Sequence, residues 1–77
     1  MMPSCWREEV LEAMPLRKEI SIPEIVDTLR PGLTAARRHE LIGRTHEVLT
    51  SQIKWGTVRK TGTGSYNGWK VTTWMRM

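Results

Sequence analysis

The chain has 77 residues, of which 12 are Lys or Arg and 8 are Asp or Glu, giving a formal net charge of +4. This length allows one small domain and excludes a catalytic domain joined to a cofactor domain. The single cysteine excludes an intrachain disulfide and a zinc site built from several cysteines. No more than two hydrophobic residues stand side by side, which excludes a transmembrane helix and predicts an intracellular protein.

The charge is unevenly distributed along the chain. Residues 1–29 carry three basic and six acidic side chains, a net of −3, whereas residues 30–77 carry nine basic and two acidic ones, a net of +7. From Thr57 onward there is no acidic residue. An unopposed basic segment is typical of a protein that binds nucleic acid or another anionic surface. A solvated basic surface without a partner is the alternative interpretation.

The first predicted helix covers about residues 4–14. Ser4 is a suitable N-cap. Pro15 ends the helix, because a proline inside a helix lacks the backbone N–H and its ring clashes with a carbonyl group of the preceding turn. Its apolar residues recur at helical spacing and are Trp6, Val10, Ala13 and Met14. The segment Ile20-Ser21-Ile22 then predicts a very short strand, because β-branched residues favour extended backbone.

The second predicted helix covers residues 22–29. The stretch from Ser21 to Glu24 has the form of a capping box, with Pro23 in the first turn. One apolar stripe follows the helical period and consists of Ile22, Ile25, Val26 and Leu29. Pro31 and Gly32 end this helix, because the residue before a proline is pushed away from helical angles.

The third predicted helix is the longest and covers about residues 34–54, with Thr34 as its N-cap. Its apolar side consists of Leu41, Ile42, Thr45, Val48, Leu49, Gln52 and Ile53. Gly43 near the middle weakens a helix by about 1 kcal/mol relative to alanine. Two shorter helices are therefore the alternative, but we expect one. Glu40 lies four residues before Arg44, the favourable order for a helical ion pair.

A hairpin is predicted after Gly56. Residues 57–61 and 69–74 are rich in β-branched and aromatic residues and predict two strands. Residues 62–68 (GTGSYNG) are rich in turn formers and predict the loop between them. We expect Trp55, Trp69 and Trp74 to pack in the core or on the hairpin, because a thin core needs large aromatic side chains.

The order helix, short strand, helix, turn, helix and hairpin resembles the winged helix-turn-helix family of DNA-binding domains. Residues 21–29 (SIPEIVDTL) are similar to the second helix, residues 32–34 (GLT) to the turn, and residues 49–60 to the end of the recognition helix and the start of the wing. The resemblance implies an α+β fold with three helices, a very short first strand and a C-terminal two-stranded hairpin, the wing, at about residues 57–74. We expect one such domain over residues 1–77.

The resemblance also implies where DNA binds. In this family the start of the third helix enters the major groove, and the wing contacts the phosphate backbone or the minor groove. The predicted DNA-binding residues are Thr34, Arg37, Arg38, His39 and Arg44 in the third helix, and Arg59, Lys60, Tyr66 and Lys70 in the wing. The alternative is a solvated helix end and an ordinary hairpin whose lysines prevent edge-to-edge aggregation.

The sequence contains no complete pattern for catalysis or metal binding. His-Glu pairs at 39–40 and 46–47 begin like the His-Glu-x-x-His zinc motif, but Gly43 and Thr50 stand where the second histidine belongs. His39 and His46 are seven residues apart, about 10.5 Å along a helix, which is too far to share one metal ion. We therefore predict no cofactor, no metal and no enzymatic activity.

These observations predict a sequence-specific binder of double-stranded DNA, either a small transcriptional regulator or an accessory factor of a mobile element. The expected location is the cytoplasm, with nucleoid association in a bacterium or archaeon, and no membrane partner is expected. A homodimer or a partner protein is compatible with this function. The first alternative is a protein-interaction module of a larger assembly, in which Ala36 and Gly43 allow another helix to approach closely. RNA binding is a second alternative.

Overall fold

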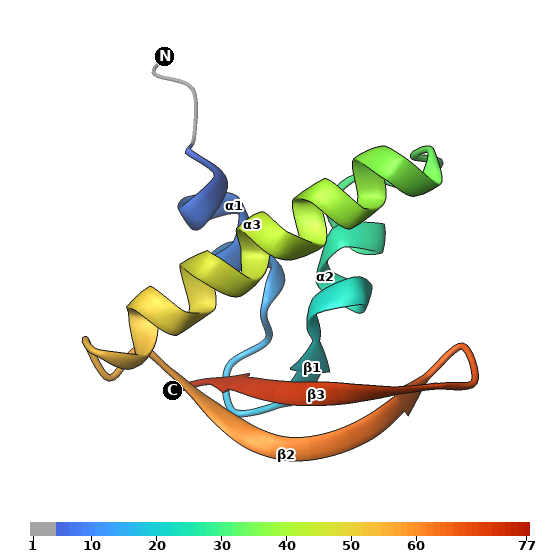
Figure 1. Cartoon of the computed structure of the whole chain (residues 1–77). Helices are drawn as coiled ribbons and strands as arrows, with labels where there is room; N and C mark the ends of the chain where they lie inside the picture. Colours follow the sequence, from blue (N-terminus) through green and yellow to red (C-terminus); the bar gives the residue numbers. More distant parts are fainter. Residues whose placement is uncertain (1–4) are drawn as a thin grey trace.

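The computed structural model of the chain describes residues 5–77 and consists of three helices and three strands in that part of the chain (Figure 1). The elements are α1 (Trp6–Ala13), β1 (Glu19–Ser21), α2 (Ile22–Leu29), α3 (Ala35–Ile53), β2 (Val58–Tyr66) and β3 (Trp69–Arg76). The strands form one antiparallel sheet in the order β1-β3-β2, and Figure 1 shows the helices on one side of it. This arrangement confirms the predicted α+β winged helix architecture.

The helix ends follow the capping signals of the sequence. Ser21 and Glu24 occupy the positions of the predicted capping box at the start of α2, and the Glu24 carboxylate accepts a hydrogen bond from the Ser21 amide at 3.4 Å, whereas the buried Ser21 hydroxyl has no partner among residues 5–77. Thr34 is the N-cap of α3, where its hydroxyl accepts a hydrogen bond from the Arg37 amide at 3.3 Å. The predicted cap of α1, Ser4, lies outside the described residues, and Cys5 occupies the N-cap position of the helix.

The prediction of one continuous third helix is confirmed, since α3 runs through Gly43 without a break. Its buried residues are Leu41, Thr45, Leu49 and Gln52, and Ile42 and Val48 are partly buried beside the core. The expected apolar side therefore faces inward, except at Ile53, whose side chain is 43% exposed. Ile53 is the last helical residue, and α3 extends there past the elements that cover its middle.

The predicted loop at residues 62–68 is wrong. β2 continues through most of it to Tyr66, and the wing (β2, β3 and their turn) closes with the two residues Asn67 and Gly68 before β3 begins at Trp69. Their φ angles are +51° and +79°, as a type I′ hairpin turn requires. The glycines before the turn lie within β2, and Gly62, with φ +148°, follows a one-residue shift in register after Lys60. The wing is therefore a long twisted ribbon with a tight tip.

The hydrophobic core lies between the helices and the sheet. Every helix and both wing strands contribute to it, and its members are Val10, Met14, Ile22, Ile25, Val26, Leu41, Leu49, Val58 and Trp74. Trp6 packs beside this cluster and donates a hydrogen bond from Nε1 to the Thr45 hydroxyl at 3.1 Å. In residues 5–77, none of the helices combines the length and the hydropathy that are needed to cross a bilayer.

The expectation for the tryptophans is correct for Trp74 and wrong for two others. Trp74 is 1% exposed, whereas Trp55 is 78% and Trp69 is 76% exposed. Trp55 lies in the turn between α3 and β2, beyond the last helical residue that could direct it inward. Trp69 is the first residue of β3, and the long ribbon carries it out to the tip of the wing.

Candidate nucleic-acid interface

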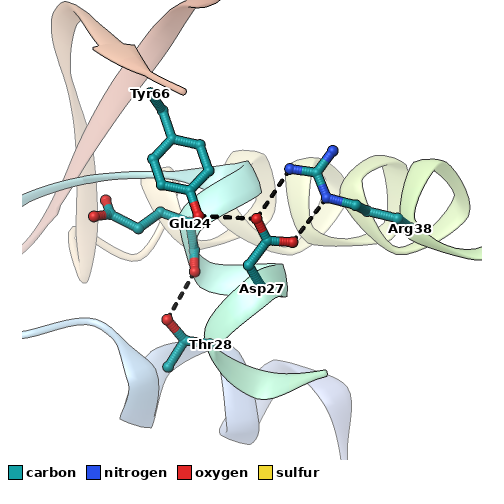
Figure 2. A network of polar contacts seen from close by, with 5 residues as sticks. All are labelled: Glu24, Asp27, Thr28, Arg38 and Tyr66. Atoms are coloured by element: carbon teal, nitrogen blue, oxygen red, sulfur yellow. Dashed lines mark hydrogen bonds and ion pairs between the residues drawn. The ribbon is translucent and has the colours of Figure 1, made fainter. Parts of the chain in front are cut away.

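A carboxylate on α2 joins the wing to the start of α3. Asp27 accepts hydrogen bonds from Arg38 Nε at 2.7 Å and Nη2 at 3.1 Å, so this ion pair is bidentate. The Tyr66 hydroxyl donates to Asp27 Oδ2 at 2.9 Å. Figure 2 shows the three side chains converging from α2, α3 and the end of β2. The predicted DNA-binding residues Arg38 and Tyr66 therefore share a partner that sequence analysis missed.

The network changes the acidity of all its members. The hydrogen bonds from Arg38 lower the pKa of Asp27, burial opposes this effect, and the hydrogen bond from Tyr66 lowers the pKa further. Donating to Asp27 raises the pKa of the Tyr66 hydroxyl and that of the Arg38 guanidinium. At neutral pH the carboxylate is ionised and the tyrosine is neutral, which is the state that these hydrogen bonds require.

Tyr66 is the only tyrosine of the chain, so the absorbance of tyrosinate at alkaline pH reports on this network alone. We expect its midpoint to lie above the ordinary value of about 10. Asp27→Asn should lower the midpoint toward that value, because the negative acceptor is lost. Glu47→Gln, an equal change of charge on the exposed side of α3, is the control and should leave the midpoint unchanged. An unchanged midpoint in Asp27→Asn would show that the Tyr66–Asp27 bond does not form.

The same variant has a predictable effect on acid stability. Because folding lowers the pKa of Asp27, its contribution is fully present above the unfolded-state pKa, about 3.9, and is lost as the pH falls through the folded-state value. Near neutral pH we expect Asp27→Asn to lose about 1 to 2 kcal/mol of unfolding free energy, since the ion pair is partly exposed. Toward acidic pH, the difference between the two proteins should shrink.

The remaining predicted residues at the start of α3 are exposed. Arg37 forms an ion pair with Glu40, with Nη1 3.0 Å from Oε2, and His39 lies beside them on the surface. The expected pairing of Glu40 with Arg44 is thus wrong, because Glu40 instead pairs with the residue three positions before it. Both partners of this pair are about half exposed, so the interaction is weak.

Arg44 lies apart from the other predicted residues. It lines an open hollow of about 400 Å³ between α1 and α3, together with Trp6 and Arg7. Glu47 also lines this hollow, so its charge is mixed. The structure therefore does not bring Arg44 together with the start of α3 or with the wing.

The basic residues of the wing have no carboxylate partner among residues 5–77. Arg59, Lys60 and Lys70 are all exposed and form no ion pair there. Lys60 Nζ lies 5.4 Å from the centroid of the Trp74 ring, a cation–π contact. Trp74 also meets the ring of His46 in an edge-to-face contact at 5.8 Å between centroids. The base of the wing is therefore packed directly against α3.

A hollow of about 390 Å³ opens between the wing tip and the helices, and is called here the wing-tip hollow. Pro23 and Asp27 of α2, Arg38 of α3, and Tyr66, Asn67 and Trp69 of the wing line it. Asn67 and Trp69 are further residues that sequence analysis missed. The Asn-Gly dipeptide between alternating residues was the available signal, because it is the strongest short-range mark of a hairpin turn.

Among the described residues, no three His, Cys, Asp or Glu side chains come together as a metal site. Comparison of the chain with protein-family models, with curated proteins and with solved structures gave no match.

Proposed function

We propose that this protein binds double-stranded DNA, with the wing as the main phosphate-binding element and the start of α3 facing the major groove. The observation that carries the proposal is that the wing lysines Lys60 and Lys70 are exposed and form no ion pair among residues 5–77, and that Lys60 lies next to α3. Lys60 pairs with Trp74 across the strands, so both point to the same face. Lys70 lies at the wing tip, on the opposite face of β3 from its neighbours Trp69 and Val71, which line the wing-tip hollow.

The position of this face relative to α3 suits a duplex. Trp74 contacts both Lys60 and His46, and His46 is on the exposed side of α3, so Lys60 lies beside that side of the helix. The Asp27 network ties the wing tip to α2 and α3, which supports a constant spacing between wing and helix. Such preorganised positive charge favours phosphate binding without loss of conformational freedom.

The arginines at the start of α3 have different parts in this proposal. Arg38 is a positioning residue, because its bidentate bond to Asp27 occupies the donors that would otherwise bind guanine. Arg37 is held only by an exposed pair with Glu40, so it can exchange that partner for DNA. Together with Thr34 and His39 it provides the polar groups for base contacts. Glu47 lies about 12 Å further along the helix axis than His39, beyond this part of α3.

Sequence-specific regulation of transcription, or an accessory role in a mobile element, is the biological task that we propose for such a domain. The chief alternative remains docking of another protein on the exposed side of α3. There, a side chain added at Gly43 would meet nothing within 4 Å, so a partner could approach the helix closely.

Two single variants test the wing. Lys60→Ala and Lys70→Ala should each weaken binding to every duplex sequence alike. Each should also reduce the slope of log affinity against log salt by about 1, because one phosphate contact is lost. Fluorescence anisotropy of labelled random duplexes at several salt concentrations measures both effects.

Lys18→Ala is the matched control, because Lys18 is also an exposed lysine without an ion pair among residues 5–77 and lies just before β1, away from the wing tip. Its slope should equal that of the unchanged protein. If all three variants change the affinity and the salt slope by the same amount, binding depends only on the net charge of the protein, and the wing does not contact DNA. If Gly43→Glu abolishes capture of a partner protein and the lysine variants leave DNA affinity unchanged, the docking alternative is correct.

A further inference from the structure

We infer that the wing-tip hollow receives an unpaired nucleobase, which stacks on Trp69. This inference rests on the proposed DNA binding and names the kind of DNA that the protein prefers: a duplex with an unpaired or extruded base. The carrying observation is an indole that is 76% exposed at the mouth of a hollow of about 390 Å³.

The Trp69 indole forms no hydrogen bond or aromatic ring contact with the other described residues. Its cross-strand partner is Tyr66, whose hydroxyl is engaged with Asp27, so the tip is held without a contribution from the indole nitrogen. A large planar side chain beside a preformed hollow is suited to stack on a nucleobase, because every base has a π face. The volume of the hollow lies within the range of small-ligand sites, about 300 to 1,000 Å³.

The polar lining also matches a base. Asn67 carries an amide donor and an amide acceptor, the pair of groups that recognises a base edge through two hydrogen bonds. The one carboxylate in the lining, Asp27, has its charge paired with Arg38, and its two oxygens already accept hydrogen bonds. The hollow therefore lacks a free negative charge that would repel a nucleotide.

The surrounding charge favours a nucleic acid over a peptide. Lys70 is the residue after Trp69, and residues 57–77 contain no acidic side chain. The phosphates of a strand whose base stacks on Trp69 thus remain beside the basic wing. A proline-rich peptide could also lie on aromatic side chains, but it would gain nothing from the wing lysines.

The test compares two DNAs that differ only in one base. One is a blunt duplex, and the other is the same duplex with a single unpaired thymine in its centre. We expect the unchanged protein to bind the second more tightly by about 5- to 150-fold, the range for one stacked base. Trp69→Ala should remove this preference and leave the affinity for the blunt duplex unchanged. Trp69→Phe should retain part of the preference.

Trp55→Ala is the matched control, since Trp55 is equally exposed at the other end of the molecule and should not affect either DNA. Equal binding of both DNAs by the unchanged protein would overturn this inference, and the proposed function would stand if the wing lysines still governed affinity. Failure to bind any DNA would overturn both. Quenching of tryptophan fluorescence by a proline-rich peptide in the unchanged protein but not in Trp69→Ala, without a preference for the unpaired base, would assign the hollow to a protein partner and overturn the inference.

Discussion

Replacing Leu49 with alanine is expected to lower the free energy of unfolding by about 2 to 5 kcal/mol. Leu49 is fully buried in the middle of the core-facing side of α3. The long helix cannot move inward to fill the space, because it is held by α1, α2 and the wing along its length. At about 0.05 to 0.15 kcal/mol per residue, a chain of this size has about 4 to 12 kcal/mol in total. The variant should therefore be largely unfolded or sharply destabilised in a urea titration followed by circular dichroism.

Gly43→Ala on the same helix is the control for this prediction. Gly43 is exposed, and an added side chain would meet nothing within 4 Å, so alanine should stabilise the protein by about 1 kcal/mol. A near-neutral effect of Leu49→Ala would mean that α3 buries another side. The exposed residues of α3 that are assigned here to DNA would then also be wrong, because the assignment requires the Leu49 side of the helix to be the buried one.

The helices could be predicted from the sequence because their signals are local. The Ser21 to Glu24 capping box and Pro31 determine the bounds of α2, and Thr34 determines the start of α3. The inward side of α3 follows from residues three and four apart, which report on one another without tertiary information. Ile53, the last apolar residue of α3, was expected to face the core but is exposed. Periodicity shows which side of a helix is apolar, but not where the neighbouring elements that cover this side end.

The wing was only partly predictable. Two segments rich in β-branched residues predict that the wing exists. Its length was underestimated, because the glycine-rich part of β2 has the amino-acid composition that is typical of a loop. Gly64 illustrates the reason, since a side chain there would meet the Thr73 methyl at 3.0 Å. Glycine thus serves close packing of the strands at this position rather than a turn. The exposed position of Trp69 at the tip follows directly from the extra length.

The site required the three-dimensional structure. Asp27 lies 11 residues from Arg38 and 39 residues from Tyr66, and no pattern in the sequence connects residues so far apart. Sequence analysis identified the two ends of this network as DNA contacts, whereas the structure shows them bonded to a third residue. It also left open which of the basic side chains lack ion pairs. Among residues 5–77 all basic residues of the wing lack one, as do Arg7, Arg17, Lys18, Arg44 and Lys54.

Binding of double-stranded DNA is tested most directly by a salt titration with random duplex DNA, duplex RNA and single-stranded DNA side by side. With at least the three wing cations on phosphates, affinity for duplex DNA should fall about 40-fold or more between 50 and 200 mM salt, as counterion release requires. Duplex RNA should bind more weakly, because its A-form grooves do not admit α3 as the B-form major groove does. Equal affinity for duplex RNA, or an affinity for duplex DNA that does not change with salt, would contradict this account.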